Sequence, residues 1–366
     1  MNTLTISNFK GYSQPTSVEF SNLTVNVGMN SVGKSTVVQS LLLIRHTLDE
    51  IQKYAGTQQT ELTIPLNGPY DLQLGNFDRL SSDGTDRISL KVDGHAFVFH
   101  KNTDKFSLLF SLDNTPNILS ECTFGQSDFY YINAERQGPR NYQDILSHTN
   151  HLCGIHGEYT FDTIEQNLYQ TVVETRRRVG ESFTVSTLAK QIEYWMDYIV
   201  PGIEFRTDED VDTRTAKLMI RQTTLDTDWS SPHNFGFGIS YLLPIIVTGL
   251  LAQPNSTLII ENPEAHLHPS GQSHIGAFLA QIAFSGVNVI VETHSEHVLN
   301  GIRLYSLKNA IAPDRICINY FSIQNKTPQI NRILLNERMD VLQWPDGFFD
   351  QEEKDLAELR FLRRKK

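Results

Sequence analysis

The sequence predicts a two-lobed α/β protein whose main sheet is largely parallel. A glycine-rich loop directly follows an apolar run at 23–27, and two further apolar runs, at 257–260 and 288–291, each end in a glutamate. Buried parallel strands read as continuous apolar runs, and their carboxyl ends meet at one edge of the sheet. With 366 residues, the chain can bury a large core divided between two lobes.

The first element is a strand that leads into a phosphate-binding loop. Residues 28–36 read GMNSVGKST and fit the pattern G-x-x-x-x-G-K-[ST]. In such a loop, backbone N–H groups and the next helix's N-terminus bind phosphate, the lysine reaches the β- and γ-phosphates, and the hydroxyl ligates Mg²⁺. We therefore expect nucleotide to be bound by Asn30, Ser31, Val32, Gly33, Lys34, Ser35 and Thr36.

The next segments alternate between helical and strand patterns. Residues 36–54 place apolar side chains on one helical stripe, whereas 88–131 alternate apolar and polar residues around an Asp-Gly turn. We expect an antiparallel β lobe at about 60–133 and a helical insert at about 155–200 that carries a basic run at 176–178. A strand pattern resumes at 217–221. No sustained heptad pattern occurs, so no long coiled coil is expected.

The second motif is TLIIENPEAHLHP at 257–269. An acidic side chain at the end of a buried parallel strand lies at the edge where the phosphate loop opens. We therefore expect Glu261 and Ser35 to hold Mg²⁺. The strand at 288–291 continues into Glu292-Thr293-His294, which can place an imidazole at the γ-phosphate.

The third motif is NFGFGISYLL at 234–243. Its glycines precede an apolar helix that opens at Ser240, and a helix N-terminus is an anion site. Because the chain already has one phosphate loop, a second site is most useful on nucleotide bound to another subunit. This reasoning predicts that Gly238 and Ser240 act across a homodimer that forms on ATP, although glycine before an apolar helix is also common without function.

Together these motifs resemble the ABC-type ATPase heads of the OLD, RecF, SMC and Rad50 group. The chain is most similar to the compact bacterial AAA-type ATPases that end in a W-P-x-G-F-F-D tail, as found in antiphage defence modules. The resemblance runs from NFKGY at 8–12 through AERQGPR at 134–140 and ETHSEH at 292–297 to WPDGFFD at 344–350. It implies an ATPase head at 1–312 and a strand-and-helix tail at 313–366.

The resemblance also implies roles for single residues. Ser240 would contact the γ-phosphate of the partner subunit, and His294 would be the switch histidine. Arg136 or Arg140 would supply positive charge near the site.

The sequence departs from most ABC heads directly after Glu261. That position usually holds a glutamate that polarises the attacking water, and here it holds Asn262, whose amide cannot accept a proton at neutral pH. Glu264 can replace this missing glutamate if the turn places its carboxylate beside the attacking water, and His294 then helps to orient the water. We expect slow hydrolysis, unless Glu264 is well placed. Slow hydrolysis suits a switch that stays closed on ATP.

Histidine spacing raises one alternative, a zinc site. Zinc hydrolases typically use an H-E-x-x-H pair on a helix face, which this chain lacks, so the ATPase interpretation is favoured. The histidines concerned are His266, His268, His274, His294 and His297.

Composition favours a soluble cytoplasmic protein. The net charge of −11 argues against general wrapping of nucleic acid. The three cysteines form no C-x-x-C pair, which argues against a disulfide framework and a thiolate zinc site. The N-terminus lacks a signal-peptide pattern. The longest apolar run, 239–252, is shorter than the roughly 20 residues that span a bilayer, so no membrane association is expected.

Two functions remain open beyond ATP binding. One is a sensor or switch ATPase that controls a separate effector, a nuclease or another toxin, in bacterial defence against phage. The other is a RecF-like DNA-repair clamp on duplex DNA; a transport-linked ATPase is disfavoured because no membrane segment is visible. The roughly fifty residues after Pro313 are too few for a fused Toprim nuclease, so no intrinsic nuclease is expected. The basic run at 363–366 is either a solvated end or a polyanion contact.

Overall fold

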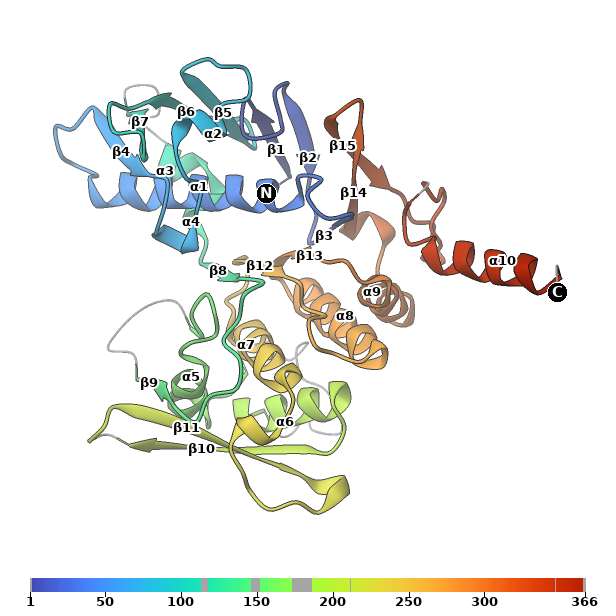
Figure 1. Cartoon of the computed structure of the whole chain (residues 1–366). Coiled ribbons are helices and arrows are strands. Elements are labelled where there is room, and N and C mark those ends of the chain that lie inside the picture. Colours follow the sequence, from blue (N-terminus) through green and yellow to red (C-terminus); the bar gives the residue numbers. More distant parts are fainter. Residues whose placement is uncertain are drawn as a thin grey trace.

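The computed structural model describes residues 2–112, 118–145, 152–172, 186–210, 212–345 and 347–364. Helix α1 (Lys34–Lys53) lies between an antiparallel sheet and a mainly parallel sheet, and further helices cover the other face of the parallel sheet (Figure 1). The predicted two-lobed α/β fold is confirmed. The longest helix among the described residues is α1, with 20 residues, so this part of the chain contains no long coiled coil.

The main sheet has six strands in the order β15-β14-β3-β13-β12-β8, and all neighbours are parallel except β15 and β14. Its register pairs Glu261 at the end of β12 with Glu292 at the end of β13, and Glu292 in turn with Asn26 of β3. The sheet therefore brings both glutamates beside the strand that leads into the phosphate loop. Its strands are β3 (Leu23–Gly28), β8 (Phe129–Ile132), β12 (Thr257–Glu261), β13 (Asn288–Glu292), β14 (Ile316–Gln324) and β15 (Thr327–Ile333).

The antiparallel sheet also has six strands, in the order β2-β1-β5-β6-β7-β4. The expected range of about 60–133 covers four of these strands, but the N-terminal strands β1 and β2 join them through β5, and β8 belongs to the parallel sheet. The small helices α2 (Phe77–Leu80), α3 (Ile118–Glu121) and α4 (Thr123–Gln126) complete this lobe. Its strands are β1 (Thr3–Ser7), β2 (Thr16–Glu19), β4 (Glu61–Pro65), β5 (Arg87–Val92), β6 (His95–Lys101) and β7 (Ser107–Ser111).

The insert combines helices with a small third sheet. Helices α5 (Thr160–Asn167) and α6 (Leu188–Ile199) lie in the expected helical range, and the hairpin β10 (Ile203–Asp210) and β11 (Thr215–Gln222) follows them and pairs with β9 (Gln143–Asp144). The insert is therefore a mixed α/β unit and not helical alone. The basic run at 176–178 lies outside the described residues.

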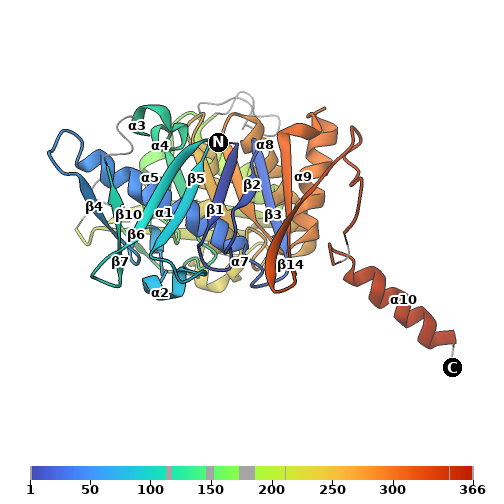
Figure 2. The ribbon, with the colours of Figure 1, turned by 90° about the horizontal axis from the view of Figure 1, so that it is seen from above.

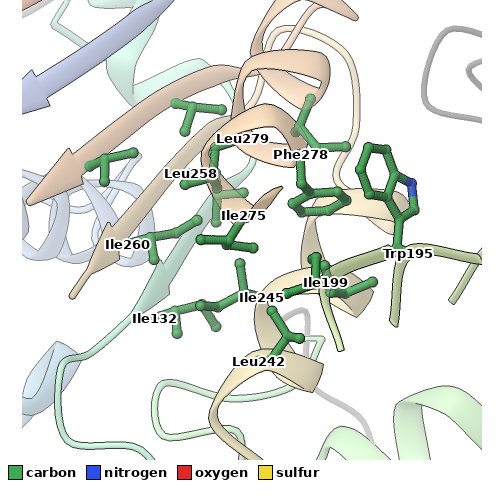
Figure 3. Packing of buried hydrophobic residues seen from close by; sticks show 14 of the residues in the cluster. Ile132, Trp195, Ile199, Leu242, Ile245, Leu258, Ile260, Ile275, Phe278 and Leu279 are labelled. Carbon is green, nitrogen blue, oxygen red and sulfur yellow. The ribbon is translucent and has the colours of Figure 1, made fainter. Parts of the chain in front are cut away.

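Helices α6, α7 (Phe237–Leu251) and α8 (Pro269–Phe284) cover the face of the parallel sheet opposite α1. Figure 3 shows their contact: Leu258 and Ile260 of β12 face Ile275 of α8. Trp195 of α6 packs edge to face on Phe278 of α8, with 4.8 Å between ring centroids. Helix α9 (Glu296–Lys308) packs closely on α8 through Gly276 and Gly301. This apolar layer fixes the sheet whose edge carries the site.

The C-terminal segment starts as sheet and ends as a projecting helix. Phe348 is buried against Tyr320 of β14 and Trp344, with ring centroids 5.4 and 5.0 Å away, so the aromatic tail motif anchors the segment to the main sheet. Helix α10 (Gln351–Arg364) then extends away from the body (Figure 2). No helix among the described residues has the length and apolar character needed to cross a membrane.

Candidate nucleotide site

The phosphate loop joins β3 to α1 in a backbone conformation that needs glycine. Gly28 and Gly33 have φ values of 143° and 106°, in the left-handed region that side chains rarely adopt. A Cβ on Gly33 would lie 2.5 Å from the hydroxyl of Tyr12, and one on Gly28 would collide with the main-chain oxygen of Phe321. The loop is therefore packed from both sides by the surrounding structure.

Lys34 opens α1 and is 3 % exposed. Its ammonium donates to the main-chain oxygens of Gly28 and Met29 at 2.9 and 2.6 Å, so its charge lies at the centre of the loop. Burial lowers the pKa of Lys34, and the negative charges of Glu292 and Glu264 act in the opposite direction. Such a buried, oriented ammonium is what phosphate binding requires.

The carboxylate in contact with Ser35 is Glu292. The Ser35 hydroxyl donates to Oε1 of Glu292 at 2.9 Å, and the Oε2 atom of Glu292 is buried without a hydrogen-bond partner. Burial and the neighbouring charge of Glu261 raise the pKa of Glu292 to about 7. The sequence motifs predict that Ser35 and Glu261 hold Mg²⁺ together and do not predict this contact, because strand order within a parallel sheet cannot be read from the sequence.

Glu261 lies one strand further from the loop and is held from the opposite side. The hydroxyl of Tyr131, on β8, donates to Oε1 of Glu261 at 3.0 Å. Burial raises the pKa of Glu261, while this hydrogen bond and the charge of Arg136 lower it. The two glutamates thus form an acidic pair at the ends of adjacent strands, with Glu292 buried and Glu261 half-buried.

Arg136 supports the turn after β12 from below the surface. It is 3 % exposed, and its guanidinium donates to the main-chain oxygens of Asn133, Glu261 and Asn262 at 2.9, 2.7 and 2.7 Å. It also lies 5.0 Å from the ring centre of Tyr241. The guanidinium of Arg136 therefore binds main-chain carbonyl groups of the fold. Arg140, the other arginine considered, is exposed.

Asn262 occupies the turn in a left-handed conformation, with φ of 46°, which asparagine tolerates better than most residues. Its N–H donates to the main-chain oxygen of Glu292, and its Oδ1 atom is buried without a partner. Glu264 accepts from the Thr293 hydroxyl at 2.7 Å and from the His294 N–H at 2.8 Å. Both of its oxygens therefore fix the turn after β13.

The loop, the two strand ends and the turn after β13 line one cavity of about 540 Å³. Burial, followed by the charge of Lys34, lowers the pKa of His294, which favours a neutral imidazole at pH 7. The expected residues that line the cavity are Asn30, Ser31, Gly33, Lys34, Ser35, Thr36, Glu261, Asn262 and His294. Lining residues that sequence reasoning missed include Lys10, Tyr12, Gln39 and Glu292.

Four expected residues do not line this cavity. The Val32 side chain is buried in the core, which leaves only its main chain for phosphate, and Glu264 is engaged as described. Gly238 and Ser240 lie in the first turn of α7, where Gly238 packs against the main-chain oxygen of His266. Phe237, which precedes them, is 51 % exposed.

The histidines of the zinc alternative are dispersed. His266 contacts the ring of Phe237, His274 stacks on Tyr198, and His294 lines the cavity beside the phosphate loop. Across the described residues, no group of three or more His, Cys, Asp or Glu side chains is arranged to hold a metal ion.

A comparison with known families matches the domain that carries the site. A family model described as "AAA domain, putative AbiEii toxin, Type IV TA system" matches residues 23–300, which include the phosphate loop and both glutamate-ending strands. The chain belongs to this family. It has an AAA domain. A second model, described as "Protein of unknown function (DUF3696)", matches residues 311–359. No curated protein matches the sequence.

Solved structures share the fold of this AAA ATPase. One is an SMC head bound to the C-terminal winged-helix domain of ScpA, with 13% identity and a TM-score of 0.52 over 92% of this chain and 98% of that one. Another is the SMC head with an extended coiled coil, bound to the C-terminal domain of ScpA from Pyrococcus furiosus, with 12% identity and a TM-score of 0.52 over 98% of this chain and 99% of that one. At such identities the likeness shows the fold alone.

Proposed function

We propose that this AAA ATPase is a slowly hydrolysing, ATP-driven switch that dimerises on Mg²⁺-ATP and controls a separate effector protein. The observation that carries the proposal is the single cavity in which Lys34, Ser35, Glu261, Glu292 and His294 meet. A phosphate loop, acidic side chains and an imidazole at one sheet edge are the parts that bind a nucleoside triphosphate and its metal ion.

Each part of the cavity has a proposed task. The N–H groups of 30–36 and the Lys34 ammonium bind the β- and γ-phosphates, and the neutral His294 lies where a γ-phosphate would end. The Ser35 hydroxyl and the buried carboxylates offer the oxygen ligands that Mg²⁺ prefers. When bound, Mg²⁺ neutralises charge on the phosphates.

Slow hydrolysis follows from the turn after β12. Asn262 lines the cavity with an amide that can orient water through its free Oδ1 atom but cannot take its proton. Glu264 is the nearest alternative base in sequence, and both of its oxygens accept hydrogen bonds from Thr293 and His294. The bound triphosphate would therefore persist, which suits a switch.

Dimerisation is supported by the position of the α7 motif. Gly238 and Ser240 lie in the first turn of α7, which begins at Phe237 and not at Ser240 as the sequence predicted. The N-terminus of such a helix can bind an anion, and both residues lie outside the chain's own cavity. A second subunit placed head to tail would present them to the first subunit's γ-phosphate. The exposed Phe237 beside them is available for the same interface.

Effector control is supported by the relatives. The matching family is described in terms of a type IV toxin–antitoxin system, and both compared SMC heads are described as bound to a domain of ScpA. If this chain also binds a partner protein, its family's link to a toxin system fits an ATPase sensor in bacterial defence against phage. The damaging chemistry would then belong to the partner.

Light scattering with a non-hydrolysable ATP analogue and Mg²⁺ tests the proposal. We expect the molar mass to double relative to nucleotide-free protein, and Ser240→Arg to abolish this increase without loss of nucleotide binding. Gln253→Arg is the matched control, because Gln253 is exposed at the opposite end of β12. A mass that does not respond to nucleotide in wild-type protein would argue for a static scaffold.

A further inference from the structure

Glu292 is the acidic side chain that contacts Ser35 of the phosphate loop, although the sequence motifs predict Glu261 as the metal ligand. Strand β13 lies between β3 and β12, so Glu292 ends the strand that is hydrogen-bonded directly to the loop strand. Glu261 ends the strand beyond it. Of the two, Glu292 makes the hydrogen bond to the Ser35 hydroxyl, at 2.9 Å.

The remaining oxygen of Glu292 has no partner. The residue is 5 % exposed, and its Oε2 atom is buried without a hydrogen bond. Glu292 also lines the cavity that Lys34 and Ser35 line. A buried carboxylate oxygen without a partner carries a large desolvation cost. A cation between this oxygen and the Ser35 hydroxyl would remove that cost.

Glu261 is already engaged on its far side. Its Oε1 atom accepts from Tyr131, and its main-chain oxygen accepts from Arg136. These contacts hold Glu261 toward β8, away from β3 in the strand order. Its second carboxylate oxygen can still contribute to a shared site, but its orientation is set by Tyr131.

We propose that Glu292 is the principal carboxylate ligand, direct or through one water, of the metal ion that Ser35 binds, and that Glu261 plays a supporting part. The inference rests on the proposed Mg²⁺-ATP function and adds a residue to it.

Binding of Mn²⁺, a spectroscopic substitute for Mg²⁺, tests the assignment. The free Mn²⁺ signal in electron paramagnetic resonance measures metal affinity in the presence of a non-hydrolysable ATP analogue. We compare wild-type protein with Glu292→Gln and Glu261→Gln, and use Glu296→Gln as a control that removes the same charge four residues beyond Glu292, on α9. Nucleotide affinity in EDTA is measured for each variant as a check on folding.

We expect Glu292→Gln to weaken Mn²⁺ binding by more than about tenfold, because even residues behind the ligands cost 10- to 100-fold. Its nucleotide affinity in EDTA should stay within a few-fold of wild type, and Glu261→Gln should lose less metal affinity than Glu292→Gln. Wild-type Mn²⁺ affinity in Glu292→Gln, with loss in Glu261→Gln, would overturn the inference and leave the proposed function intact. Absence of nucleotide binding by wild-type protein would instead overturn the proposed function.

A crystal structure of the wild-type protein with Mn²⁺ and the analogue gives a second test that does not depend on a variant. The anomalous signal of the metal should lie within ligand distance of Ser35 and within reach of Glu292 through at most one water. A metal contacted by Glu261 with Glu292 more than one water away would refute the assignment.

Discussion

Replacement of Arg136 by methionine tests whether this arginine is a structural support of the site. The side chain is 3 % exposed and donates to three main-chain oxygens at 2.7–2.9 Å, two of them on Glu261 and Asn262. Arg136→Met keeps most of the side-chain length but removes all donors, which leaves those carbonyls without their partner.

The expected cost follows from these contacts. Hydrogen bonds to a charged group contribute about 1.5–3 kcal/mol each, and a buried polar group left without its partner costs about 1–3 kcal/mol. Part of this is offset because Arg136 is itself buried, with its Nε atom unpaired. Burial lowers the pKa of Arg136 only to about 10, so the charge and its hydrogen bonds are present at pH 7. We therefore expect Arg136→Met to lower the free energy of unfolding by about 3 kcal/mol.

Urea unfolding at pH 7 measures this difference. Arg140→Met is the matched control, because Arg140 is exposed and lies in the same segment, and we expect it to change stability by less than about 0.5 kcal/mol. If Arg136→Met unfolds at the same urea concentration as Arg140→Met, the structural role is refuted. The expectation that Arg136 supplies positive charge to the site would then regain support.

Three further predictions concern the carboxylates, the turn after β12 and the helix packing. In EDTA, Glu292→Gln should stabilise the protein by about 2–3 kcal/mol more at pH 8 than at pH 5. A carboxyl whose pKa is about 7 in the folded state and 4.5 in the unfolded state destabilises the fold increasingly as pH rises from 4.5 to 7, and the effect levels off above pH 7. Equal effects in urea unfolding at both pH values would contradict this. Asn262→Glu should raise ATP turnover by about 10²-fold or more, whereas Glu264→Gln should keep the wild-type turnover. Loss of phosphate release in Glu264→Gln would identify Glu264 as the base. Gly301→Ala should cost about 2–3 kcal/mol in thermal unfolding, since its Cβ would collide with the main chain of Ser273 on α8, and an unchanged melting temperature would show that α8 and α9 can separate freely.

Local patterns were sufficient to predict the elements that carry the site. The apolar runs at 257–260 and 288–291 form β12 and β13, and the phosphate loop lies between β3 and α1, because each of these features depends on neighbours in sequence. The helix expected at 36–54 appears as α1. Fold class and most cavity residues follow from these segments.

Long-range pairing could not be predicted in the same way. The contact between Glu292 and Ser35 requires β13 to lie between β3 and β12, and a sequence does not state strand order. Likewise β1 reaches the antiparallel lobe by pairing with β5, more than eighty residues later. The sequence also does not show that Arg136 lies beneath the turn after β12, where it donates to the main-chain oxygens of Glu261 and Asn262.

The direct test of the central claim is calorimetric titration of wild-type protein and Lys34→Ala with Mg²⁺-ATP. The buried Lys34 ammonium lies at the centre of the phosphate loop, and a charge-assisted contact contributes about 1.5–3 kcal/mol, so its removal should weaken binding by about 10- to 100-fold. Lys53→Ala, at the exposed end of α1, should bind as the wild type does. Equal affinity of Lys34→Ala and wild-type protein would contradict the assignment of the cavity as the ATP site.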